Sequence, residues 1–175
     1  FLHGSSMDTE FIDPVMPPGY RERFGASRKH QLLRVLASLP RENAHRERIA
    51  EIYSKWCSDH GFFTQIVPPD CRPTYLRFPL LVEGRADLLA AAQAERLEIG
   101  DWMNAPLHPQ EANAGAFGYA IGDCPIADSV AERVINLPTH RHINSREANR
   151  LLAFLAHRQD CIAKNPVGIK VPSQP

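Results

Sequence analysis

Apolar side chains recur at helical spacing in the first third of the chain, in two stripes separated by a proline. The first stripe ends at Pro40 and contains Leu32, Leu33, Leu36 and Leu39. The second stripe contains Ile49, Ile52, Tyr53 and Trp56. A spacing of three and four residues is typical of one helix face, and proline disrupts a helix interior. The pattern therefore predicts two helices that are joined near Pro40.

A different period begins at Tyr75. From Tyr75 to Val82, alternate residues are apolar, which is typical of a strand with one buried face. The residues expected on that face are Leu76, Phe78, Leu80 and Val82. Pro79 cannot donate a ladder hydrogen bond, so we expect an edge position or a bulge there.

Short helices and strands follow one another in the rest of the chain. The expected helices are the Ala- and Leu-rich stretch 85–96, a helix from Pro125 to about Arg133, and one that Asn144 and Glu147 start as a capping box. The expected strands are 97–100 and 134–137. This order predicts an α+β fold, with a small sheet of a few strands backed by helices on one side.

Composition narrows the class of protein. The 175 residues carry 20 basic and 20 acidic side chains, so the chain lacks the broad positive field that nucleic-acid binding needs. Its apolar runs are too short to cross a bilayer, and no secretion-signal pattern opens it. The four cysteines are far apart, which argues against a disulfide framework or a structural zinc site. We expect a cytoplasmic protein with no nucleic-acid or membrane partner.

The chain has fifteen prolines, which gather in connectors and tails and so suggest where its domains begin and end. We expect a flexible lead-in over residues 1–18, partly derived from cloning, and linking helices over 19–60. A small α+β domain would occupy 61–160, and a Pro-rich tail 161–175.

Candidate chemistry is concentrated between Ile99 and His140. His108 and His140 lie at the ends of predicted elements, where side chains commonly face a ligand. His140, His142 and His108 could be metal ligands, but no acidic or Cys residue lies at a helpful local spacing, so polar turn histidines are the default. Trp102 could be a pocket wall or an indole at the edge of the core. The residues alone predict a ligand face around His108 and no metal site.

Three motifs in this region resemble the DegT-type sugar aminotransferases, in matching order and spacing. They are Pro106-Leu107-His108-Pro109-Gln110, then Cys124-Pro125-Ile126-Ala127 after Gly118-Tyr119, and Leu137-Pro138-Thr139-His140-Arg141-His142. The resemblance covers most of residues 19–157. These enzymes depend on pyridoxal phosphate, have the aspartate aminotransferase fold and aminate nucleotide-linked keto-sugars. The resemblance identifies the chain with the C-terminal, small-domain part of such an enzyme.

The resemblance implies roles for particular residues. His108, with Asn104 and Trp102, would line the nucleotide-sugar pocket, while His140 and His142 would hold the turn between the last strand and helix. A family element whose Asn touches the cofactor phosphate of the neighbouring subunit aligns with Gly19–Gly25. Arg21 stands at that Asn position. It could bind the phosphate through a charge-assisted fork, or it could equally mark a relaxed or lost cofactor contact.

The family's cofactor-binding lysine and its partner carboxylate belong to a large N-terminal domain. Here the lysines are Lys29, Lys55, Lys164 and Lys170, none in the family's setting. Forming an imine with the cofactor requires a positioned amine. We therefore expect the cofactor to be held in the intact enzyme but not by this chain alone, which would be inactive by itself and contribute no catalytic residue.

Two other hypotheses remain open at this point. The chain could be a non-catalytic, stand-alone domain that pairs with itself or a partner through the apolar faces of its first helices. It could also be a sugar-nucleotide-binding regulator without turnover. The leading hypothesis instead needs a homodimer or a separate N-terminal half.

Overall fold

The computed structural model describes residues 16, 18–23, 25–108, 110 and 112–164. Most of the predicted lead-in (1–18) and most of the predicted tail (161–175) lie outside these residues. The proposed division into domains stays a prediction.

A long first helix replaces the two that the sequence predicts. Helix α1 spans Ala26–His60, with Pro40 inside it, so the prediction of a break near Pro40 is wrong. Leu36, Ala37, Arg41 and Glu42 flank the proline and are good helix formers, which favours a continuous helix. The helix ends where Gly61 adopts a left-handed conformation and its N–H bonds to the last turn.

Two antiparallel strands form the sheet of the described residues. Strand β1 (Arg77–Leu81) pairs with β2 (Val134–Pro138), and Pro79 lies opposite Asn136. The alternation predicted from Tyr75 is confirmed at Phe78, Leu80 and Val82, which are buried. Leu76 is 61% exposed because β1 begins after it. The sheet position of Pro79 agrees with the predicted edge, since a two-stranded sheet consists of edges.

The predicted strand 97–100 is wrong apart from its last residue. Gly100 forms an isolated antiparallel bridge with Asn136, through N–H···O bonds of 2.9 and 2.7 Å. An added Cβ at Gly100 would lie 3.3 Å from the Arg77 guanidinium and 3.7 Å from Asn136 Cβ. Glycine therefore lets this segment approach the outer side of β2 closely.

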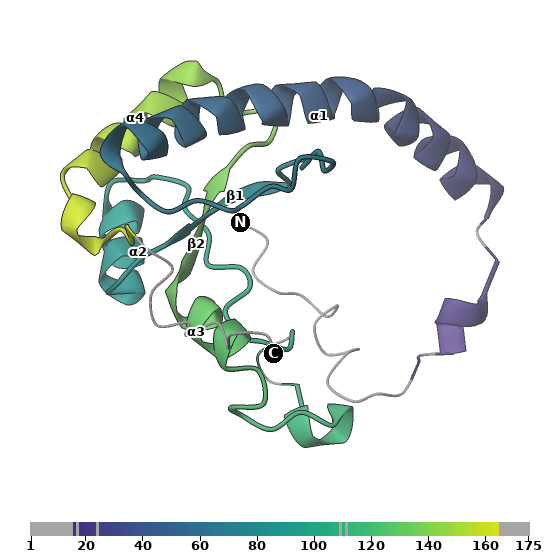
Figure 1. Cartoon of the computed structure of the whole chain (residues 1–175). Helices are drawn as coiled ribbons and strands as arrows, with labels where there is room; N and C mark the ends of the chain where they lie inside the picture. The colour runs from purple at the N-terminus through teal and green to yellow at the C-terminus, as the bar shows by residue number, and fades with distance from the viewer. Residues whose placement is uncertain (1–15, 17, 24, 109, 111, 165–175) are drawn as a thin grey trace.

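The other helices agree well with the sequence predictions. They are α2 (Arg85–Ala94), α3 (Pro125–Arg133) and α4 (Ser145–Ala156), with 3-10 turns at Pro18–Arg21 (η2), Ala114–Phe117 (η3) and Gln159–Cys161 (η4). Pro125 occupies the first turn of α3. Asn144 caps α4 by accepting the backbone N–H groups of Arg146 and Glu147. Figure 1 shows α4 lying beside the C-terminal part of α1, with the two strands below them.

One apolar core joins these elements. It gathers Tyr53 and Cys57 of α1, Phe78 and Leu80 of β1, Ile135 and Leu137 of β2, and Leu151 and Leu155 of α4. Burial of the Cys57 side chain raises the pKa of its thiol to about 12. The predicted α+β class is confirmed. No helix among the described residues has both the length and the apolar character needed to cross a membrane.

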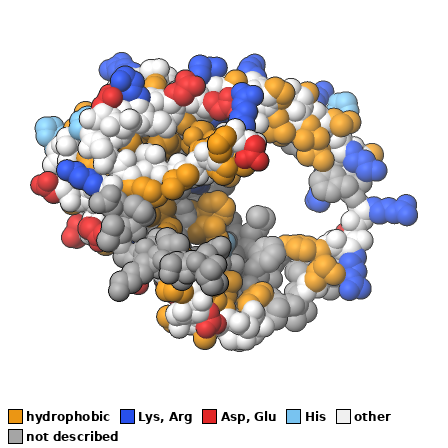
Figure 2. All heavy atoms as spheres, viewed as in Figure 1, with side chains coloured by type: hydrophobic (Ala, Val, Ile, Leu, Met, Phe, Trp, Pro, Cys, Tyr) orange, Lys and Arg blue, Asp and Glu red, His pale blue; other side chains and the backbone are white. Residues whose placement is uncertain are grey.

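The N-terminal half of α1 extends beyond this core (Figure 1). Its apolar side chains are exposed, at 41–65%: Leu32, Leu33, Val35, Leu36 and Leu39. We call these five residues the α1 apolar face. Figure 2 shows hydrophobic side chains interspersed with Lys and Arg along this part of the helix.

Candidate functional site

The segment after the Gly100 bridge carries the first of the predicted site residues. The Asn136 side chain, on β2, donates a hydrogen bond to the Trp102 carbonyl. On the other side, the Arg77 guanidinium lies 5.8 Å from the centroid of the Trp102 ring. The His108 ring meets the Trp102 ring edge-on, with 5.8 Å between centroids. Trp102 and His108 therefore form one surface cluster that is anchored to the sheet.

Asn104 lies in a different place, on the wall of a cavity. This cavity has a volume of about 540 Å³ and lies between the 104–114 segment and α3. Its polar lining residues are Arg85, Asn104, Gln110, Tyr119, Asp128 and Glu132. Its apolar lining includes Pro106, Leu107 and Ile121. The Pro-Leu part of the predicted element thus faces this cavity, whereas His108 is in contact with Trp102.

The sequence reasoning named Tyr119 only as part of a motif and did not identify Asp128. The Tyr119 hydroxyl donates a hydrogen bond to one Asp128 oxygen, and the other oxygen accepts the Gly122 N–H at 3.0 Å. The hydrogen bond to Asp128 is the main reason why the pKa of Tyr119 is raised to about 12. An acidic residue in the first turn of a helix that begins at Pro125 was the available signal, because carboxylates there accept backbone N–H groups.

Arg21 is not brought to this region. It is exposed at the end of η2, which Figure 1 places beyond the N-terminal end of α1. It does not line the cavity that contains Asn104. A phosphate contact from Arg21 would therefore belong to another site, and this role of Arg21 stays a prediction.

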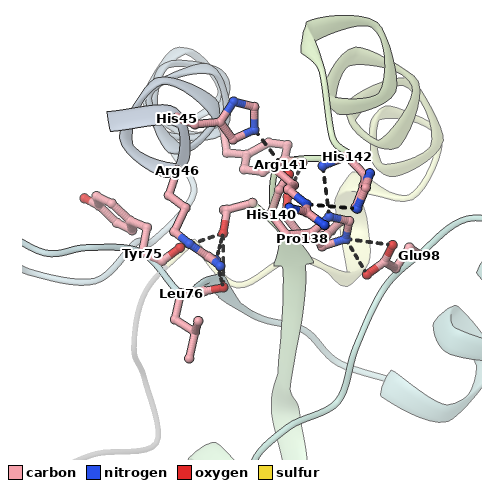
Figure 3. A network of polar contacts seen from close by, with 11 residues as sticks. His45, Arg46, Tyr75, Leu76, Glu98, Pro138, His140, Arg141 and His142 are labelled. Atoms are coloured by element: carbon pink, nitrogen blue, oxygen red, sulfur yellow. Dashed lines mark hydrogen bonds and ion pairs between the residues drawn. The ribbon is translucent and has the colours of Figure 1, made fainter. Parts of the chain in front are cut away.

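The histidines at the end of β2 form a polar network (Figure 3). His140 Nε2 donates to the Glu98 carboxylate at 2.9 Å, and His140 Nδ1 accepts the backbone N–H of His142 at 3.3 Å. His45 Nε2, on α1, donates to the His140 carbonyl at 3.2 Å. These contacts join three parts of the chain: α1, the segment of Glu98 that precedes the Gly100–Asn136 bridge, and the turn before α4. They agree with the structural role that was predicted for His140 and His142.

In the part of the chain that the structure describes, no three His, Cys, Asp or Glu side chains are grouped to hold a metal ion.

Pyridoxal phosphate needs an amine for its imine and a carboxylate at its ring nitrogen. Of the described lysines, Lys29 and Lys164 are exposed and Lys55 forms an ion pair with Asp59 at 2.9 Å. None of the three lines the cavity that contains Asn104. Lys170 lies outside the described residues. The described residues thus do not make up a complete site for this cofactor.

Comparison with known proteins tests the resemblance directly. The profile of the DegT/DnrJ/EryC1/StrS aminotransferase family matches residues 2–156. The chain belongs to this family. Aminotransferases of the DegT family use pyridoxal phosphate. Among curated proteins, none matches the sequence.

Solved structures of the DegT family confirm the fold. A DegT/DnrJ/EryC1/StrS aminotransferase from Brucella abortus is 26% identical, with a TM-score of 0.60 over 73% of this chain. DesV from S. venezuelae, solved with a ketimine intermediate, is 24% identical and has a TM-score of 0.61 over 73% of this chain. This chain spans 34% of the length of each.

Proposed function

We propose that this chain supplies the substrate-facing small unit of a DegT-type aminotransferase that acts on nucleotide-linked keto-sugars. The observation that carries the proposal is the placement of the 102–108 segment. Its Pro-Leu part lines a cavity of about 540 Å³ with Asn104, while its histidine lies on Trp102. In the intact enzyme, the amino group would come from an amino acid such as glutamate, through the cofactor.

An amide and an indole of this segment support a role in binding. Within the described residues, no hydrogen bond involves the side chain of Asn104, which is half-buried at the cavity wall. An unpartnered amide of this kind can accept from a sugar hydroxyl and donate to one. The exposed Trp102 ring, at 44%, offers a flat apolar surface for a base or a sugar.

We also propose that the α1 apolar face makes a contact with further protein. The chain matches only 34% of the length of its structural relatives. Between residues 26 and 41 the helix carries Arg28, Lys29, Arg34 and Arg41 and no acidic side chain. This charge is complementary to an occupant that carries acidic groups. We infer that the rest of the enzyme covers this face, either within one subunit or at the dimer contact.

Titration of the full chain with UDP-glucose, a nucleotide-linked sugar, tests the substrate role. We expect saturable binding, with an affinity at least about tenfold weaker in Asn104→Ala and His108→Ala, which corresponds to a lost hydrogen bond to a charged or polar ligand group. His157→Ala is the matched control, because His157 is exposed at the end of α4, away from the cavity. Binding that is equal in all three variants, or absent in the parent chain, would contradict the proposal.

A further inference from the structure

The loop that closes one side of the Asn104 cavity is folded upon itself. Asn113 caps the η3 turn by accepting the Ala116 N–H at 3.2 Å. Asp123 accepts the Ala120 N–H at 2.8 Å, and its own N–H returns to the Ala120 carbonyl at 3.0 Å. The stretch 113–124 therefore holds its own turns together, and its side-chain contacts with the rest of the molecule help to position it.

The Asp128 side chain, on α3, holds this loop. Among the described residues, both side-chain hydrogen bonds between the loop and α3 end on Asp128: one from the Tyr119 hydroxyl and one from the Gly122 N–H. Each carboxylate oxygen is thus occupied by a loop donor. Tyr119 and Ile121, which the loop contributes, line the same cavity as Asn104 and Leu107. A change at Asp128 would move this wall.

Glu132 lies one helical turn after Asp128 and lines the same cavity. Within the described chain it has no hydrogen bond or ion pair, in contrast to Asp128. Two carboxylates on one helix face thus differ in their hydrogen bonding. One has both oxygens occupied by the protein, and the other has both available.

We propose that Asp128 is a positioning residue that holds the 113–124 loop in place and so sets the width of the cavity, while Glu132 is the carboxylate that meets the ligand. This inference rests on the proposed function for the ligand itself, but the attachment of the loop can be tested without it. The neutral phenol of Tyr119 is the form that the attachment needs. A tyrosine is already neutral throughout the neutral range, and the hydrogen bond to Asp128 raises its pKa further.

Amide hydrogen exchange of the full chain tests the attachment. In Asp128→Asn a single oxygen remains for two donors, so we expect the Gly122 amide to exchange at least about tenfold faster. Tyr119→Phe should produce a smaller increase, and Asp128→Glu, which restores two oxygens, should bring exchange back towards the parent rate. Glu132→Gln is the matched control and should leave Gly122 unchanged. The Asn136 amide, bonded to Gly100, reports whether the sheet is intact.

Unchanged exchange of Gly122 in both Asp128→Asn and Tyr119→Phe would overturn the positioning role. Equal loss of protection at Asn136 in both variants would also overturn it, because Asp128 would then support the whole fold. UDP-glucose affinity separates the two carboxylates: we expect it to fall in Asp128→Asn and in Glu132→Gln, with faster Gly122 exchange only in the former. If UDP-glucose does not bind the parent chain, the proposed function and the Glu132 assignment fail, and the exchange result still decides the role of Asp128.

Discussion

Thr139 is the buried polar residue on which three segments converge at the end of β2. Its hydroxyl lies 2.6 Å from the Tyr75 carbonyl oxygen and 3.1 Å from that of Leu76. The Arg46 guanidinium, on α1, donates to the same hydroxyl at 3.3 Å and to the Leu76 carbonyl at 2.8 Å. The sequence placed Thr139 within a motif but did not reveal this role, because its partners are more than sixty residues away.

Replacement of Thr139 by valine keeps the shape of the side chain and removes the hydroxyl. Thr139 is fully buried, so the Tyr75 carbonyl would lose its partner without regaining water. We expect the free energy of unfolding to fall by about 1–3 kcal/mol, measured by urea denaturation. Thr64→Val is the control, since Thr64 is half-buried and its hydroxyl has no described partner. An equal effect of both substitutions would contradict this role for Thr139.

At the scale of whole elements, the sequence predicts best where a helix or strand is determined by its own residues. The starts of α3 and α4 follow from Pro125 and Asn144, whose local chemistry defines a helix N-terminus. Helix α1 and the segment 97–100 were predicted wrongly. Pro40 did not break α1, and the segment 97–100 reaches β2 only at Gly100. Which strands pair depends on contacts between distant parts of the chain, and local periodicity does not contain that information.

The cap of α4 offers a test at this scale. Asn144 Oδ1 accepts two backbone N–H groups, at 2.9 and 3.1 Å. Asn144→Ala leaves both donors without this acceptor, so we expect a loss of about 0.5–2 kcal/mol in the free energy of unfolding. Asn149→Ala, at an exposed interior position of the same helix, should change stability slightly in the opposite direction, because alanine is the better helix former. Thermal and urea unfolding monitored by circular dichroism would measure both, and equal signs would refute the assignment.

For the molecule as a whole, the α1 apolar face is the surface on which the proposed contact with further protein rests. The α1 apolar face is exposed, although its residues resemble those that other helices of this chain bury. The sequence predicted the helical stripe correctly but not its exposure, because a periodic pattern shows that a face is apolar without showing what covers it. The candidate site is similar. The sequence named Trp102, Asn104 and His108 but not Asp128, and the separation of Asn104 from the Trp102–His108 pair needed the structure.

Exposure of this face predicts concentration-dependent association of the chain in solution. Sedimentation velocity should show species larger than the monomer as concentration rises. The double substitution Leu33→Glu and Leu36→Glu should shift the sample towards monomer, since both side chains are exposed and lie on the face. Ile66→Glu, at a 79% exposed apolar position outside α1, is the control and should leave association unchanged. A monomer at all concentrations would argue against an uncovered interface.

The most direct test of the account is whether this chain can hold the family's cofactor covalently. Pyridoxal phosphate would be added to the full chain, followed by borohydride reduction and peptide mass analysis of all four lysines. We predict no stoichiometric adduct, because the described lysines lie outside the Asn104 cavity and Lys55 is paired with Asp59. A stoichiometric, reducible adduct at a single lysine would contradict the claim that this chain shapes a substrate site without supplying the amine that works in it.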